Sequence, residues 1–225
     1  MAVVQPDSTW NPLLLAAAIG LAAYLIGSIS PAYLVVRRLR GQDIRRLGDG
    51  NAGAENVARV AGLKAGILVA ALDIAKGLLV VLLARALTPE DSTLFSPAPL
   101  LTDESYRLSV MLLAGVAVVL GHSWPLYLKG TGGRGAAAGV GVLFGLVPLA
   151  SLLVLLPAVG LMWLTRSSTW GLAFFFIGAA VATGGLGQLG LFGYSWLLAP
   201  YAVAVPALVG AIHWLSLRRG RTAEG

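Results

Sequence analysis

The chain has 225 residues and a formal net charge of +6; 57% of its residues are hydrophobic, 12% are charged, and the mean hydropathy is +0.82. A soluble domain of this size would carry about twice that charged fraction, which excludes an ordinary soluble globular protein. The chain has no cysteine, which excludes disulfides, thiolate nucleophiles and cysteine metal sites. The apolar residues form long runs typical of membrane-spanning helices. We therefore expect one all-α, polytopic membrane domain over residues 1–225.

The first predicted helix covers residues 13–36 and carries small residues and a proline near its far end. The residues before it lack the basic flank of a cleavable signal peptide, so we expect this helix to be retained. Gly27, Ser28 and Ser30 permit close helix packing, and Pro31 predicts a kink. A strongly polar loop, residues 37–59, follows.

The second predicted helix, residues 62–87, contains two charged side chains within an apolar run. Asp73 and Lys76 are three residues apart on one helical face, so they can form an ion pair. Charge inside a membrane marks a functional site by default, although a pair that only orients helix packing fits the sequence equally well. The next loop, residues 88–104, is rich in proline and serine and is acidic.

The third predicted helix, residues 108–120, leads into a glycine-rich stretch, residues 121–135. The apolar run at 136–164 is long for one span and contains Pro148 and Pro157, so we interpret it as a broken pair of short helices. A single span there would instead place Arg166 outside the cell. A further span is predicted over residues 170–183, then a glycine-rich connector at 184–193 and a last helix over 196–217.

The distribution of positive charge predicts the orientation, because cytoplasmic loops are enriched in lysine and arginine. The cations gather in the first loop, the glycine-rich stretch and the tail. They are Arg37, Arg38, Arg40, Arg45, Arg46, Lys129, Arg134, Arg218, Arg219 and Arg221. We therefore expect about seven transmembrane or partly spanning helices, with the N-terminus outside and the C-terminus cytoplasmic.

Two segments, residues 48–53 and 130–135, fit the pattern G-x-G-x-x-G. A dinucleotide fingerprint needs a buried strand before it and an acid about 20 residues after it. The first copy follows a charged segment, and the second has no acid until Glu224, so that interpretation fails. A phosphate site fits better, since glycine brings N–H groups close to a ligand and helices begin just after both segments. Alternatively, the glycines make tight turns and the nearby cations fix topology, which leaves Asn51 and Asn56 unexplained.

The two histidines, His122 and His213, each lie near a predicted cytoplasmic helix end. With no carboxylate near either of them in the sequence, they do not make a metal site. Each suits a hydrogen-bonded structural position, and acid–base work or phosphate contact is the alternative.

These residues together resemble the acyl-phosphate-dependent glycerol-3-phosphate acyltransferases, the PlsY family. The resemblance rests on residues 27–31, 43–45, 48–59, 73–77 and 121–135, and on His213 with Arg219. Their order, spacing and predicted cytoplasmic placement agree with that family over nearly the whole chain.

The resemblance implies that a fatty acyl group passes from acyl phosphate to glycerol 3-phosphate, giving lysophosphatidic acid and phosphate in phospholipid biosynthesis. It implies an active site on the cytoplasmic face of the cell membrane, in contact with membrane lipid. It implies no metal, cofactor or nucleotide, and we expect no nucleic-acid partner. The implied catalytic residues are His122, His213 and Asn51. The implied substrate- and phosphate-binding residues are Ser28, Arg45, Asn56, Arg59, Lys129, Gly132, Gly133 and Arg134.

Five positions depart from the family pattern. Asp49 and Glu55 replace a serine and a threonine, Thr131 and Arg134 replace lysines, and Ser216 replaces an asparagine. Carboxylates beside a phosphate site repel the ligand unless cations neutralise them, and Arg45, Arg46 and Arg134 are the candidates.

We therefore expect either an active, diverged acyltransferase or a paralogue with a changed acceptor. A non-catalytic binder of anionic lipid and an unrelated small transporter are the other candidates. A transporter would place polar residues at mid-membrane, where only Asp73 and Lys76 qualify.

Overall fold

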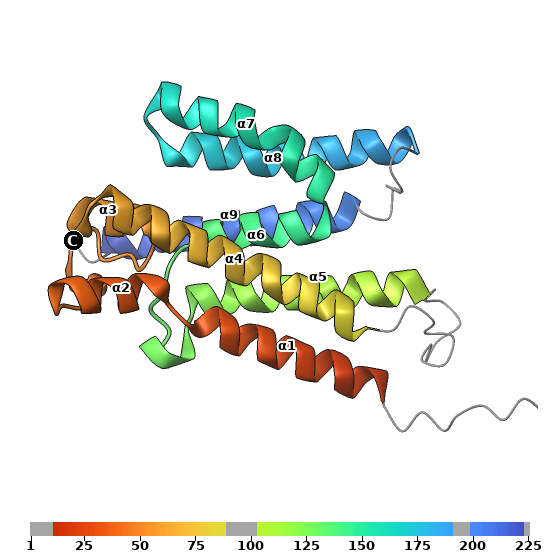
Figure 1. The fold of residues 1–225 in the computed structure, drawn as a ribbon, viewed down its shortest axis with the longest axis horizontal. Helices are drawn as coiled ribbons and strands as arrows, with labels where there is room; N and C mark the ends of the chain where they lie inside the picture. The colour runs from red at the N-terminus through yellow and green to blue at the C-terminus, as the bar shows by residue number, and fades with distance from the viewer. Residues whose placement is uncertain (1–10, 89–102, 191–198, 223–225) are drawn as a thin grey trace, which may run out of the picture.

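The computed structural model describes residues 11–88, 103–190 and 199–222, and all the regular elements within them are helices (Figure 1). The α-helices are α1 (Pro12–Ser28), α2 (Pro31–Arg40), α3 (Ala54–Ala61), α4 (Leu63–Leu87), α5 (Asp103–Ser123), α6 (Ala136–Leu146), α7 (Pro148–Thr165), α8 (Ser168–Gln188) and α9 (Ala199–Thr222). Two 3₁₀ turns, η1 (Ile44–Arg46) and η3 (Leu126–Leu128), lie between them.

The described chain contains seven apolar helical segments. Five are long and apolar enough to cross a membrane: Pro12–Arg40, Leu63–Leu87, Tyr106–Leu128, Pro148–Thr165 and Ser168–Gln188. Two are shorter, Ala136–Leu146 and Ala202–Leu215. The protein is thus an all-α polytopic membrane protein, with about the number of spanning and partly spanning helices that the apolar runs predict.

The first predicted helix is broken rather than continuous to residue 36. It ends at Ser28, and α2 begins at Pro31 with Ser30 as its N-cap, whose hydroxyl accepts a hydrogen bond from the Tyr33 N–H at 3.3 Å. Proline has no N–H to continue the helical ladder, and serine offers the backbone an alternative partner. The kink predicted at Pro31 is therefore a full break in the helix.

Four glycines let two pairs of helices touch backbone to backbone. A Cβ on Gly27 or Gly121 would lie 2.3 or 2.2 Å from a carbonyl oxygen of the facing helix in the α1–α5 pair. A Cβ on Gly77 or Gly141 would lie 2.2 or 1.9 Å from one in the α4–α6 pair. Such close approach is the usual role of small residues between membrane helices. It brings the end of α5 against the break after α1.

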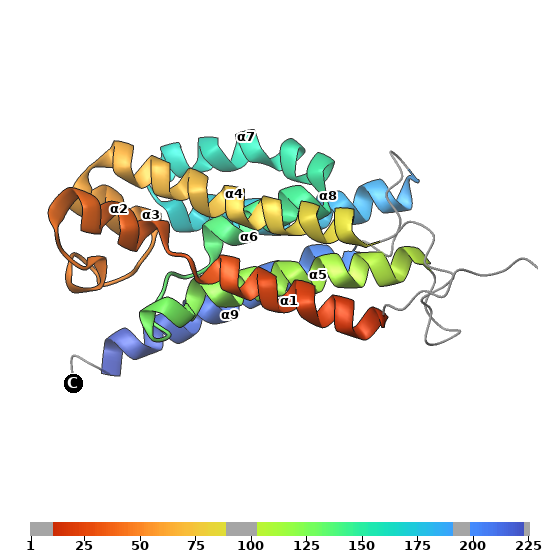
Figure 2. The ribbon, with the colours of Figure 1, turned by 60° about the horizontal axis from the view of Figure 1, so that its bottom comes forward.

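In the second half of the chain, α7 and α8 pack as a pair on one side of the bundle, and α6 and α9 lie within it (Figure 1). The predicted break in residues 136–164 is confirmed, since α6 ends at Leu146 and α7 begins at Pro148. The predicted connector at 184–193 was wrong in part, because α8 continues through Gln188. In both Figure 1 and Figure 2, α7 lies on the opposite side of the bundle from α1.

The polar segments gather at one end of the bundle. The residues predicted as a loop at 37–59 contain the end of α2, η1 and most of α3, and they pack around their own small core of Ala32, Val36, Ile44, Ala52, Val57, Ala65 and Val69. The glycine-rich stretch, the α7–α8 turn and the C-terminal end of α9 lie at the same end (Figure 1). Arg166, in the α7–α8 turn, therefore lies at the same end as the other basic segments. That position is the one predicted if residues 136–164 form two helices rather than one. Most of the acidic loop at 88–104 lies outside the described residues.

Candidate functional site

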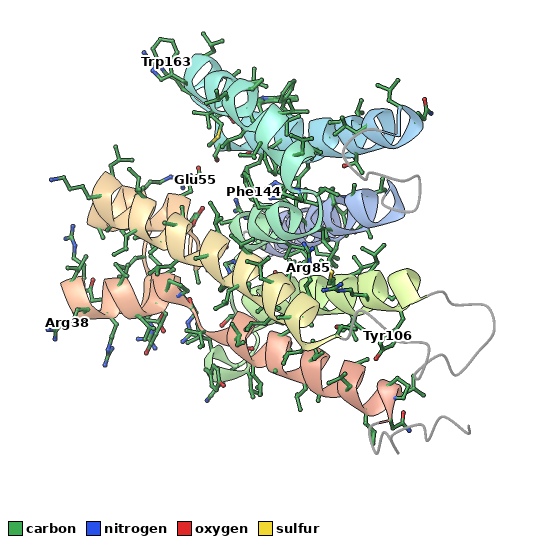
Figure 3. All side chains as sticks on the ribbon, turned by 45° about the vertical axis from the view of Figure 1, so that its right-hand side comes forward. Arg38, Glu55, Arg85, Tyr106, Phe144 and Trp163 are labelled. Atoms are coloured by element: carbon green, nitrogen blue, oxygen red, sulfur yellow. The ribbon has the colours of Figure 1, made fainter. Side chains whose placement is uncertain are left out.

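A cavity of about 710 Å³ opens at this polar end between α3, α4, α6, α7, α8 and α9. Its polar lining consists of Asn51, Glu55, Asp73, His122, Arg134, Ser168, Thr169 and His213. Its deeper lining is apolar and includes Ile67, Ala70, Ile74, Val140, Leu155, Val159, Leu172, Phe175, Phe176 and Val209. Figure 3 shows Glu55 on the face of α3 that is turned toward the α7–α8 pair. The cavity therefore joins a charged mouth to an apolar interior.

Asn56 shapes the first loop from inside it. Its side chain is fully buried, and its amide nitrogen donates to the carbonyls of Leu47 at 2.9 Å and Asn51 at 3.0 Å. Its amide oxygen accepts from the Asp49 N–H at 3.2 Å. Both hydrogens of its side-chain amide are therefore donated to carbonyls of the loop, and the bond to the Asn51 carbonyl holds Asn51 at the cavity.

Arg45 joins the first loop to the glycine-rich stretch. Its Nη1 donates to the Leu128 carbonyl at 2.8 Å and to the Thr131 hydroxyl at 2.7 Å, while Nε and Nη2 bind Asp43. The hydrogen bond from Arg45 holds the pKa of the Asp43 carboxyl below its usual value. Thr131, where the resembled family has lysine, is therefore an attachment point for Arg45.

The two added carboxylates at the mouth are neutralised by arginines. Asp49 Oδ2 lies 3.3 Å from Arg59 Nη1 and 3.8 Å from Arg134 Nη2, so the expected partner Arg134 is confirmed. Glu55 pairs with Arg59 and accepts a hydrogen bond from Ser168 at 2.8 Å. The expectation that Arg45 neutralises these carboxylates was wrong, because its guanidinium pairs with Asp43.

The ionisation of Glu55 follows from these contacts. Burial disfavours its charged form, but the hydrogen bonds from Ser168 and Arg59 outweigh burial and lower its pKa. Arg59 is correspondingly committed to Glu55 and Asp49. Arg134 is different, since its buried Nε has no hydrogen-bond partner among the described residues. A buried guanidinium N–H of this kind is suited to an anionic ligand.

A buried charged cluster lies beneath the mouth. Lys76 Nζ is 2.7 Å from Asp73 Oδ1, which confirms the predicted pair. His122 Nδ1 lies 3.2 Å from the same carboxylate oxygen and 3.0 Å from Lys76 Nζ. The fold thus gives His122 a carboxylate neighbour that it lacks in the sequence. Asp73 lies on a different helix, 49 positions away in the chain, so no local pattern could reveal it.

The other predicted site residues fall in two groups. His213 lines the cavity. The predicted binding residues absent from its lining are Ser28, Arg45, Asn56, Arg59, Lys129, Gly132 and Gly133. The buried Ser28 hydroxyl ties α1 to η3, donating to the Tyr24 carbonyl at 2.9 Å and accepting from the Leu126 N–H at 3.2 Å. Lys129 is exposed in a left-handed turn with φ of 55°.

Gly132 and Gly133 hold the glycine-rich stretch against the end of α5. Their N–H groups donate to the carbonyls of Ser123 and His122 at 3.2 and 3.1 Å. These amides therefore serve the loop itself. The side chains of Ser216 and Arg219 lie outside the described residues.

Ser168 is a cavity residue that the sequence did not indicate, because it reaches Glu55 only when α7 and α8 fold back over α3. Within the described residues, no group of three histidine, aspartate, glutamate or cysteine side chains is arranged to hold a metal ion.

The chain is similar to known proteins over most of its length. The family model described as glycerol-3-phosphate acyltransferase matches residues 17–221. A glycerol-3-phosphate acyltransferase of Halalkalibacterium halodurans is 36% identical over 202 residues, which cover 90% of this chain and 86% of the relative. One of Myxococcus xanthus is 43% identical over 154 residues, covering 68% and 72%.

Solved structures agree with this similarity. A crystal structure of PlsY, an integral membrane glycerol 3-phosphate acyltransferase, in the glycerol 3-phosphate form has a TM-score of 0.70 and 30% identity over 92% of both chains. The lysophosphatidic acid form of the same enzyme has a TM-score of 0.68 and 28% identity, again over 92% of both chains.

Replacing Arg45 by lysine is expected to loosen the glycine-rich stretch. An ammonium group cannot reach Asp43, Leu128 and Thr131 together as the planar guanidinium does. Hydrogen bonds to a charged group contribute about 1.5–3 kcal/mol, so amides at 128–131 should exchange at least about tenfold faster. Hydrogen exchange followed by mass spectrometry measures this. Arg46→Lys, at the exposed neighbouring position, should leave exchange unchanged, and equal protection in both variants would contradict the bridge.

Proposed function

The chain belongs to the glycerol-3-phosphate acyltransferase family and is an acyltransferase of phospholipid biosynthesis, and we propose that it transfers the acyl group of an acyl phosphate to glycerol 3-phosphate at the mouth of the cavity. The observation that carries this proposal is the continuity of a charged mouth with an apolar interior in one cavity. An acyl phosphate has an anionic head and an apolar tail, and its head would meet glycerol 3-phosphate at the boundary between the two regions.

The mouth supplies groups that suit two anionic substrates. Arg134 has a buried, unpartnered Nε in the part of the chain that the structure describes, and it lines the cavity beside Asn51 and the two histidines. We assign phosphate binding to Arg134, with Arg59 close to it at the rim. Charge-assisted hydrogen bonds of this kind are the strong ones in anion sites.

Catalysis at this site would rest on positioning and on charge stabilisation. The hydroxyl oxygen of glycerol 3-phosphate attacks the acyl carbonyl carbon, and the carbon–oxygen bond to the phosphate then breaks. The Asn51 amide, which lines the cavity, would donate to the charge that develops on the carbonyl or on the leaving phosphate. His122 and His213 are the candidates for proton transfer. Phosphate leaves readily, so no covalent enzyme intermediate is required.

The apolar interior suits the acyl chain. Along α8 the lining runs from Ser168 at the mouth to Ile177, and nine residue steps at 1.5 Å each give a depth of about 13 Å. The residues between them are mostly apolar or small. We infer that the chain of the donor enters along α4 and α8 while its phosphate stays at the mouth.

We infer that the mouth faces the cytoplasm in the cell membrane. The cations of the first loop, the glycine-rich stretch and the tail all belong to the mouth end of the bundle, and such enrichment is typical of cytoplasmic loops. Glycerol 3-phosphate would then reach the site from water and the acyl phosphate from the bilayer.

A changed acceptor is the second candidate, and the carboxylates of Asp49 and Glu55 favour it. Both are partly exposed at the rim, and Glu55 lines the cavity. Carboxylates accept hydrogen bonds from hydroxyl groups, so an acceptor with more hydroxyls than glycerol 3-phosphate would find partners there.

The purified protein should convert acyl phosphate and glycerol 3-phosphate into lysophosphatidic acid with release of phosphate. Asn51→Ala and Arg134→Ala should each lower turnover more than tenfold, or about 1.4 kcal/mol. Arg166→Ala, an exposed arginine at the same end and outside the cavity lining, is the matched control. Absence of turnover by the wild-type protein across several acyl phosphates and polyol phosphates would rule out the enzyme proposal. Wild-type rates in the two folded variants would rule out the assigned pocket.

Asp49→Asn tests whether Asp49 opposes or assists the acceptor. Asparagine keeps the oxygen that accepts the Asn51 N–H at 3.0 Å but no longer neutralises Arg134. An exposed ion pair is worth at most about 1 kcal/mol, so KM for glycerol 3-phosphate should fall by up to about fivefold. Steady-state kinetics measures this. A higher KM would show instead that the carboxylate contacts the acceptor.

Ala70→Phe should obstruct the apolar interior. Ala70 lines the cavity, whereas the next residue of α4, Ala71, is exposed and outside the lining. A phenyl ring at position 70 should reduce kcat/KM for a long-chain acyl phosphate at least about tenfold relative to a short-chain one. Ala71→Phe should not change that ratio. If both variants keep the wild-type preference, the acyl chain lies elsewhere.

A further inference from the structure

The polar end of the bundle carries a second group of cations, outside the cavity. The carboxylates of the first loop, residues 37–59, all pair with Arg45, Arg59 or Arg134. Five exposed basic side chains of the same region form no ion pair with any residue that the structure describes: Arg37, Arg38, Arg40, Arg46 and Lys64. The outer face of this end therefore carries positive charge that the protein itself does not compensate.

Two of these arginines line a small pocket between the end of α2 and η1. Its volume is about 380 Å³, which is within the range of small-ligand sites. Its lining consists of Arg37, Gly41, Gln42, Asp43, Arg46 and Leu47. Both oxygens of Asp43 accept hydrogen bonds from Arg45, Oδ1 from Nε at 3.0 Å and Oδ2 from Nη2 at 2.6 Å. Arg37 and Arg46 are therefore left as two guanidinium groups at one pocket, an arrangement suited to phosphate.

The turn after α2 leaves most donors of these arginines available. Gly41 is in the left-handed conformation with φ of 67°, and a Cβ there would meet nothing within 4 Å. Arg37 Nη1 donates to the Gly41 carbonyl at 3.4 Å, which uses one of the five guanidinium hydrogens. The Arg46 side chain donates to no residue in the described part of the chain. An anion at this turn would therefore find unoccupied N–H groups on both sides.

The pocket lies at the level of the lipid headgroups. The 17 residues of α1 span about 25 Å, which is close to the thickness of a hydrocarbon core. The ten residues of α2 continue outward from α1 for about 15 Å in both views (Figure 1, Figure 2). Exposed aromatic side chains, which are typical of the membrane–water interface, lie at the same end. They are Tyr127, Trp163 and Trp170, of which Figure 3 shows Trp163.

An apolar surface leads from the bilayer to the pocket. Leu34 is three positions before Arg37 and four before Arg38, so the three side chains share one face of α2. Leu34 is exposed, as is Ile29 at the break after α1. Figure 3 shows Arg38 extending away from the bundle at the end of α2. A ligand with its phosphate at Arg37 can thus lay an apolar chain along Leu34.

We propose that this pocket binds the phosphate group of an anionic phospholipid from the surrounding leaflet. Arg37 and Arg46 hold the phosphate oxygens. Arg38 and Arg40 disfavour a zwitterionic lipid, because its headgroup brings a second positive charge close to theirs. The pocket shares no lining residue with the cavity, so the lipid is a ligand additional to the substrates of the proposed reaction.

Native mass spectrometry of the purified full chain in detergent measures the binding. The probes are dioleoyl phosphatidylglycerol, which is anionic, and dioleoyl phosphatidylcholine, which is zwitterionic. We expect the Kd of the wild-type protein to be at least about tenfold lower for phosphatidylglycerol. The double variant Arg37→Gln with Arg46→Gln should lose this preference. Arg166→Gln, which removes an exposed arginine at the same end, is the control and should keep it. An equal preference in the wild-type protein and the double variant would overturn the proposal.

Inorganic phosphate distinguishes a lipid site from a site for the free anion. Phosphate has no chain to lie on Leu34, so an excess of it should displace little phosphatidylglycerol. If phosphate binds in a way that depends on Arg37 and Arg46 while phosphatidylglycerol does not, the lipid assignment is wrong.

Hydrogen exchange locates the lipid in the wild-type protein and needs no variant. In phosphatidylcholine nanodiscs, adding phosphatidylglycerol should slow the exchange of amides 41–47 at least about threefold. Amides 165–167, in the α7–α8 turn at the same end, should not change. Unchanged exchange at 41–47 would overturn the proposal. Neither experiment contains an acyl phosphate, so an inactive protein would refute the proposed function without deciding the lipid site.

Discussion

The buried ammonium of Lys76 is the contact on which the arrangement of this protein depends. It lies where the broken end of α1, the middle of α4 and the last turn of α5 meet. A buried charge is costly in a membrane, and here the Asp73 carboxylate and the backbone carbonyls of Gly27 and Ile29 offset that cost. Removing one partner of such a pair costs about 3–5 kcal/mol in soluble proteins. The break in α1 and the floor of the candidate site are therefore maintained by the same group.

Glycines make that meeting possible. The α1–α5 and α4–α6 pairs pack with backbones in contact, so the end of α5 lies close enough to α4 for His122 to reach Asp73. The glycine-rich stretch then turns back over His122, with Gly133 in a position where a side chain would collide with the ring. The conformational and steric freedom of glycine serves packing here as much as ligand approach.

The cations at the mouth have divided roles. Arg45 joins two loops, and Arg59 balances two carboxylates. Arg134 is left with a buried donor and only a long contact to Asp49. The many basic residues of this end therefore give less free positive charge than their number suggests. The cavity combines this modest positive charge with an apolar interior, which suits an amphiphilic anion.

The sequence alone determined the all-α membrane class, because runs of apolar residues have few other stable arrangements. It also predicted that residues 136–164 form two helices rather than one and that Asp73 can pair with Lys76, since both depend on residues near each other in the chain. It could not show that Asp73 reaches His122, that Ser168 reaches Glu55, or that Arg45 holds Thr131, because each contact joins distant helices or loops. The sequence predicted that the first helix continues to residue 36 with a kink at Pro31, whereas α1 ends at Ser28. No sequence pattern showed that Lys76 donates hydrogen bonds to the backbone carbonyls at this break. Only the tertiary structure decided these contacts. Polar groups in a membrane need hydrogen-bond partners, and the packing of distant helices determines which partners are near.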